Sequence, residues 1–500
     1  MIADVRALVA FRVSTIARGR LRLRLALIAL VVVAFGFALL PQSARGLDPA
    51  RELDIRLLLP TAYLGFLVTA ALAAIGSAGG RELMQREHAV AFPVAPQVDH
   101  LGALLLSPLN LAWMLQALSL VGLTAYSMPA KASVAAGLLI TSAWIVAATA
   151  TGQALSWAIE WVRTLPHGPW LVRAVGAALG ALVVAAVLSG RTAALLDTFP
   201  TRRWGLAAYY GADGSWLIWG RRLGELALVA VVAYAVGLAV ANALARRPRN
   251  EESKAETRRM TRRREPRTDL AALLRSDRAS VWRSVPLRRG AAVLAVLPGA
   301  VAALGHIPWE TMPVLPGLVA SGAALLFGVN AWCLDGPGAW WRESLPVRPQ
   351  LLLQARTIVL LETVAVPMLI ALVLALSKAR EAPTPAEAIA LACATTVITA
   401  QVVSRSLDWA VRRPYVADLR GARATPAPPG VMAGYSARLA VATTLTGIAY
   451  GACGVSGRAD LALWLSVVLL LFVARRAVAT VRRWDTPDIR AQVVNTVARS

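Results

Sequence analysis

Long apolar stretches alternate with short polar ones along nearly the whole chain. An α-helix needs about 20 predominantly apolar residues to cross a bilayer, and runs of that kind predict six spans in each half of the sequence. In the first half they are expected near 25–41, 57–78, 101–126, 133–161, 170–190 and 222–245. In the second half they are expected near 290–307, 312–333, 351–377, 384–409, 433–452 and 460–478. The pattern predicts an all-α polytopic membrane protein with about twelve transmembrane helices.

The composition excludes a soluble globular protein. Of the 500 residues, 57% are hydrophobic and only 16% are charged, against about 25% charged in an average soluble domain. Too few ionised side chains are present to cover a globule of 52.9 kDa. The chain is therefore expected in a lipid bilayer.

The basic residues set the expected orientation. Lys and Arg number 52 and Asp and Glu 28, which leaves a net charge of +24. Most of the arginines flank apolar runs in the N-terminal segment, the centre and the C-terminal tail, so they predict contact with anionic lipid rather than with nucleic acid. The positive-inside rule predicts a multi-pass protein of the plasma (inner) membrane with both termini in the cytoplasm. Residues 191–222, which are rich in Trp and Tyr, are expected to form short helices in the outer interface.

Two sequence motifs recur at equivalent positions of the two halves. AFPVAPQ at 91–97 returns as SLPVRPQ at 344–350, each time between the second and third predicted spans. Residues 3–18 are similar to 268–283, and both segments precede the first span of their half as predicted amphipathic helices. Since each half has an even number of spans, both enter from the cytoplasm. We therefore expect two parallel six-helix repeats related by a pseudo-twofold axis along the membrane normal.

The repeats divide the chain into three parts. Residues 1–245 are expected to form the first six-span half with its N-terminal amphipathic helix. Residues 246–267 are a linker charged on all faces, interpreted as a solvated cytoplasmic connector, with a regulatory or nucleic-acid-binding role as the alternative. Residues 268–500 are expected to form the second six-span half, with its own amphipathic helix and a basic C-terminal tail.

The sequence lacks the motifs of several kinds of enzyme. A P-loop needs a lysine at the end of a glycine-rich turn, and none of Lys131, Lys254 and Lys378 has that context. HExxH and GxSxG are absent, and the four histidines have no metal-ligand spacing. The three cysteines form no CxxC pair and are interpreted as reduced packing residues. We therefore expect no catalysis, cofactor or metal in this chain.

The loops between the second and third spans of each half carry the most distinctive residues. Each combines charges on a predicted short helix with a stiff, proline-containing exit, as a lever on the cytoplasmic face would require. The alternative is an ordinary loop with turn prolines. The candidate residues are Arg81, Glu82, Arg86, Glu87, Phe92, Pro93 and Val94 in the first loop and Asp335, Gly336, Trp341, Glu343, Leu345, Pro346 and Val347 in the second.

The stretch Asn330–Arg356, with GRELMQREHAVAFPVAPQ as its counterpart, resembles permease subunits of type 2 ABC exporters. The resemblance implies that the two loops are coupling helices that dock on separate P-loop ATPase subunits, where ATP and Mg²⁺ bind. It also implies that the two halves line the path of an unknown small molecule, peptide or lipid substrate. The second half departs from the family in its short external loop, 454–460, and in its long proline-rich connection, 412–429.

Glu362 interrupts an otherwise apolar run in the predicted span 351–377. A carboxylate at membrane depth faces a cavity or a partner, here Arg356, so the two residues are candidates either for the transport path or for helix packing. An ion-gradient-driven secondary transporter of 6+6 spans is the alternative function. A lipid-linked glycosyl transferase would instead use Asp48, Glu52 and Asp54 of the first external loop.

Overall fold

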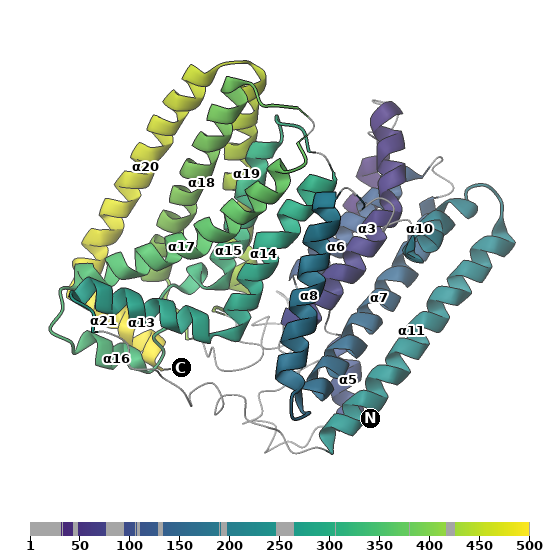
Figure 1. The fold of residues 1–500 in the computed structure, drawn as a ribbon, viewed down its shortest axis with the longest axis horizontal. Coiled ribbons are helices and arrows are strands. Elements are labelled where there is room, and N and C mark those ends of the chain that lie inside the picture. Colours follow the sequence, from purple (N-terminus) through teal and green to yellow (C-terminus); the bar gives the residue numbers. More distant parts are fainter. Residues whose placement is uncertain are drawn as a thin grey trace. The chain divides into compact units, whose positions relative to one another are not determined.

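The computed structural model (Figure 1) is helical over the residues that it describes, without a strand among them, which confirms the all-α prediction. The described residues are 32, 34–43, 49–76, 95–105, 107, 111–128, 134–189, 191, 198–246, 265–305, 307–379, 381–416 and 426–499. The chain divides into two compact units. Unit 1 comprises Met1–Gly176 and Arg191–Glu251, and unit 2 comprises Ala177–Gly190 and Glu252–Ser500.

From the second predicted span onward, the helices before the linker follow the predicted spans with one interruption, whereas residues 25–31 and 33 of the first predicted span lie outside the described residues. These helices are α3 (Pro49–Gly76), α5 (Pro96–Leu105), α6 (Leu111–Ser127), α7 (Val134–Arg163), α8 (Gly168–Ser189), α10 (Thr201–Tyr210) and α11 (Trp216–Ala245). The predicted third span, 101–126, is divided between α5 and α6. The sequence between these helices contains a proline, which cannot donate the backbone hydrogen bond that a continuous helix requires.

The predicted short helix in the 191–222 segment is present as α10, but its aromatic side chain Trp204 turns toward the core of unit 1. The Trp204 ring lies 5.2 Å from the Trp144 ring of α7. Gly205 permits this close packing, since a Cβ there would lie 2.8 Å from Cα of Pro60 in α3. The aromatic residues of this segment therefore contribute to helix packing as well as to the surface.

Unit 2 consists of upright helices with short helices across one end (Figure 1). Its elements after the linker are α13 (Asp269–Arg283), α14 (Val285–Leu304), η3 (Met312–Val314), α15 (Leu315–Leu326), η4 (Gly328–Asn330), α16 (Gly338–Glu343), α17 (Pro349–Leu376), α18 (Pro385–Arg412), α19 (Pro429–Val455), α20 (Ala459–Asp485) and α21 (Pro487–Ala498). Helix α13 is the amphipathic helix predicted before the first span of this half. It makes an angle of 80° with the segment Leu287–Ala303 that follows.

Six of the described helices have the length and apolar composition of membrane spans, as expected for a helical membrane protein. They are Val134–Arg163, Gly168–Ala186, Trp216–Ala245, Pro349–Leu376, Pro385–Arg412 and Ala459–Asp485. A seventh is obtained if the bent pair α13 and α14 counts as one span. The count of twelve and the repeat symmetry stay predictions.

A capping box fixes the start of α18. The Thr384 hydroxyl accepts a hydrogen bond from the Glu387 amide at 3.3 Å, and Glu387 Oε2 accepts one from the Thr384 amide at 2.8 Å. We expect Thr384→Ala to lower the free energy of unfolding by about 1 kcal/mol, because an orphan amide of the first turn loses its acceptor. Chemical unfolding in mild detergent measures the loss. Thr384→Ser is the control, and an equal loss in that variant would contradict the role of the hydroxyl.

Candidate functional site

The second of the two predicted loops folds into a tight turn and a short helix, α16, at the end of unit 2 where α13 and α21 also lie (Figure 1). The turn depends on Gly336, whose φ of +48° lies in the left-handed region that favours glycine. The amide of Gly338 donates to the Asp335 carbonyl at 2.9 Å and closes the turn. The Asp-Gly pair therefore places the Asp335 side chain at the entrance to α16.

Four charged side chains, two of them buried and two half-buried, join this turn to the neighbouring helices. Asp335 accepts hydrogen bonds from Arg342 of α16 and from Arg356 of α17, the latter at 2.6 Å. Asp277 of α13 lies 2.6 Å from Arg342 Nη2 and 3.4 Å from Arg356 Nε, in ion pairs that lack the alignment of hydrogen bonds. The side chains of Arg356 and Asp277 are 0% and 1% exposed. We call these four residues the charge cluster.

The charge cluster rests on a stack of two tryptophans. The Arg356 guanidinium lies 5.3 Å from the Trp332 ring centroid, within cation–π range. Trp332 in turn stacks on Trp484 of α20, with centroids 4.0 Å apart and planes 3° from parallel. The Trp484 indole donates to the Pro349 carbonyl at 2.8 Å. The first turn of α17 is thereby fixed to the last turns of α20.

Helix α16 also contacts the C-terminal helix α21. Arg490 of α21 donates to Glu343 at 2.7 Å, and the Trp340 indole donates to Asn495 Oδ1 at 3.0 Å. These contacts hold one face of α16 against α21, while the charge cluster holds its other side against α13 and α17. A six-residue helix, too short to be stable alone, is in this way supported on two sides.

The outer face of α16 exposes large aromatic side chains. Trp341 is 69% exposed and Trp340 is 56% exposed. Of the residues that follow, Pro346 is exposed, whereas Leu345 and Val347 are half-buried. Exposed Trp side chains on a supported helix are typical of a surface that contacts a partner or the membrane interface.

The residues predicted from the sequence as site candidates lie in different parts of the structure. Those of the second loop lie in or beside α16, whereas all candidates of the first loop lie outside the described residues. Arg356 is a buried member of the charge cluster. Glu362 does not contact it and instead accepts a hydrogen bond from Arg278 of α13 at 2.9 Å. That bond raises the pKa of the Arg278 guanidinium.

The sequence reasoning did not identify Asp277, Arg342, Arg490 or the stacked tryptophans as members of this site. For Asp277 a signal was present. Asp277 lies seven residues after Leu270 and four before Val281, so it falls on the apolar stripe of the amphipathic helix. A carboxylate on an apolar stripe needs a buried cationic partner, and the structure supplies two.

Over the described ranges, no group of His, Cys, Asp and Glu side chains is arranged to hold a metal ion. The three cysteines are free thiols, and Cys333 is packed in the core of unit 2. Arg356 and Asp277 of the charge cluster are buried and each is paired within the cluster, so the cluster is suited to a structural role, and Trp341 is the exposed element beside it. Comparisons with family models, with curated proteins and with solved structures gave no match.

Proposed function

We propose that this protein is the membrane-spanning permease subunit of an ATP-driven exporter, and that α16 is a coupling helix that docks on a separate P-loop ATPase subunit. The resemblance of Asn330–Arg356 to permeases of type 2 ABC exporters supports this function. The chain has no P-loop of its own. Energy for transport would therefore come from ATP and Mg²⁺ bound in the partner.

The observation that carries the proposal is the combination of an exposed Trp helix with buried, rigid supports. Trp341 projects from α16, while the charge cluster joins α16 to α17 and α13. A force applied to a helix held in this way would move α17 as a rigid body instead of bending a loop, because breaking a buried ion pair costs several kcal/mol. An ordinary connecting loop would need no such joint.

The remaining features of the proposal follow from the sequence. Twelve spans would cross the plasma (inner) membrane in two parallel halves, with the substrate path between the halves. Both termini would lie in the cytoplasm. The substrate would be a small molecule, peptide or lipid. Arg246–Arg267 would connect the halves at the cytoplasmic face.

Co-purification tests the function. The tagged full-length chain, expressed together with its neighbouring reading frames and extracted in mild detergent, is expected to retain a P-loop ATPase that has no membrane spans of its own. Reconstitution of that complex should yield transport that vanadate stops and an uncoupler does not. Absence of any Walker-type ATPase, together with transport that an uncoupler abolishes while ATP is intact, would overturn the proposal in favour of a secondary transporter.

A further inference from the structure

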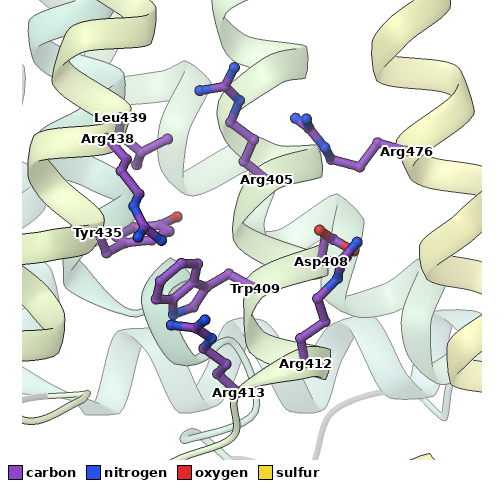
Figure 2. Close-up of a pocket in the computed structure, with 9 residues that line it drawn as sticks. All are labelled: Arg405, Asp408, Trp409, Arg412, Arg413, Tyr435, Arg438, Leu439 and Arg476. Atoms are coloured by element: carbon purple, nitrogen blue, oxygen red, sulfur yellow. Dashed lines mark hydrogen bonds and ion pairs between the residues drawn. The ribbon is translucent and has the colours of Figure 1, made fainter.

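A second feature of unit 2 is a cavity of about 280 Å³ between α18, α19 and α20 (Figure 2). Most of its polar lining residues are arginines. The lining residues are Arg405, Asp408, Trp409, Arg412, Arg413, Tyr435, Arg438, Leu439 and Arg476. Five arginines thus face a space that contains one carboxylate, which gives the cavity an excess of positive charge.

The single carboxylate is already neutralised. Asp408 accepts hydrogen bonds from Arg412 at 2.9 Å and from Arg483 of α20 at 2.6 Å. The other four lining arginines have no ion pair in the part of the chain that the structure describes. They are Arg405, Arg413, Arg438 and Arg476.

The unpaired arginines form two groups in Figure 2. Arg413 and Arg438 lie 4.7 Å and 5.4 Å from the Trp409 ring centroid, so the indole holds both guanidinium groups near one end of the cavity. Arg405 and Arg476 extend toward the other end, where their like charges repel each other. The Arg405 Nε atom is buried and has no hydrogen-bond partner.

This arrangement has an energetic cost that a bound anion would remove. Buried donors without acceptors and like charges in proximity both destabilise the fold around this cavity. Arg405 lies seven residues before the end of α18, which corresponds to about 10 Å along a helix that is apolar enough to span a membrane. Ionisable residues at such a depth are expensive and indicate a functional site.

We propose that this cavity binds the phosphate group of an anionic molecule. Guanidinium groups donate to phosphate oxygens in a paired geometry. Arg405 and Arg476, whose like charges repel each other, supply such donors from α18 and α20 at one end of the cavity. In the predicted topology the cavity lies at the level of the inner-leaflet headgroups, where basic pockets between spans meet acidic phospholipids. The same chemistry would also accept a free phosphate compound. Binding here requires no ATPase partner.

The experiment compares two charge-matched double variants of the full chain. Arg405→Gln with Arg476→Gln removes two cations from the cavity. Arg475→Gln with Arg482→Gln removes two from the exposed face of α20, outside the cavity. Native mass spectrometry measures retention of phosphatidylglycerol against phosphatidylcholine. In a parallel arm, the unfolding temperature of delipidated protein is measured with inorganic phosphate, pyrophosphate or chloride at equal ionic strength.

We expect wild type and the α20-face variant to bind one phosphate-bearing probe, and the cavity variant to bind it at least tenfold more weakly. Retention of phosphatidylglycerol alone would identify a lipid headgroup, and stabilisation by phosphate or pyrophosphate alone would identify a soluble ligand. Without ligand, the cavity variant should unfold at the same temperature as wild type or higher, because the repulsion is removed. Equal binding by all three proteins, or a lower unfolding temperature of the ligand-free cavity variant, would overturn the proposal.

Discussion

Asp335→Ala is expected to lower the free energy of unfolding by about 3–5 kcal/mol, the cost of leaving a buried charge without its partner. The aspartate accepts hydrogen bonds from both Arg342 and Arg356. Once it is removed, two guanidinium groups share the single carboxylate of Asp277, and Arg356 is fully buried. Unfolding in mixed micelles, followed by tryptophan fluorescence, measures the loss.

A second substitution tests whether charge balance is the cause. With Asp335→Ala and Arg356→Met together, the remaining Arg342–Asp277 pair at 2.6 Å is neutral overall, so we expect the double variant to recover at least about 1 kcal/mol over Asp335→Ala alone. Asp460→Ala, which breaks the exposed pair with Arg458, is the control and should unfold like wild type. A double variant less stable than the single one would contradict this account of the cluster.

If α16 docks on an ATPase subunit as proposed, Trp341→Ser is expected to weaken binding of that subunit about 30-fold or more without unfolding the protein. A central interface tryptophan contributes at least about 2 kcal/mol to binding, which corresponds to about 30-fold in affinity. The side chain is 69% exposed, and substitutions at such positions change stability by about 0.5 kcal/mol or less. The co-purified ATPase is titrated against this protein in nanodiscs, and the stimulation of ATP hydrolysis measures the affinity.

Trp464→Ser is the matched control for this prediction. That tryptophan belongs to α20 of the same unit and is also 69% exposed, but it lies near the opposite end of the helix from α21. The Trp464→Ser variant should bind the ATPase with the same affinity as the wild type. If both variants lost affinity equally, or if Trp341→Ser bound normally, α16 would be an anchor in the membrane interface instead of a docking surface.

The apolar pattern predicted the long helices of unit 2, but its predicted span 312–333 is wrong in extent, because this stretch contains η3, the 12-residue α15 and η4 instead of one long helix. The predicted spans 351–377 and 384–409 correspond to α17 and α18 within a few residues, because long apolar runs permit little else in a bilayer. Breaks in helices were less predictable. Hydropathy alone does not predict that α5 and α6 are separate helices, because both are apolar. The only sequence feature that indicates the break is a single proline between them.

The sequence predicted which loop carries the candidate site, but it did not predict which side chains from other helices pack against that loop. Asp335 and Gly336 were identified from the loop motif, and Arg356 from its proximity to Glu362. The partners that fix them, Asp277 and Trp484, lie 58 residues before and 149 residues after Asp335 in the chain. Such pairings depend on how helices pack. The periodicity within one segment predicts contacts within that helix, but it does not indicate which distant helix packs against it.

Photo-crosslinking tests the coupling role of α16 most directly. A benzophenone amino acid is introduced at position 341, with position 464 as the reference, and the full-length protein is irradiated in native membranes with its neighbouring reading frames expressed. We predict a crosslinked product at 341 that contains a P-loop ATPase, with none at 464. Crosslinks from 341 to lipid alone, in membranes where export is active, would contradict the docking of an ATPase on α16.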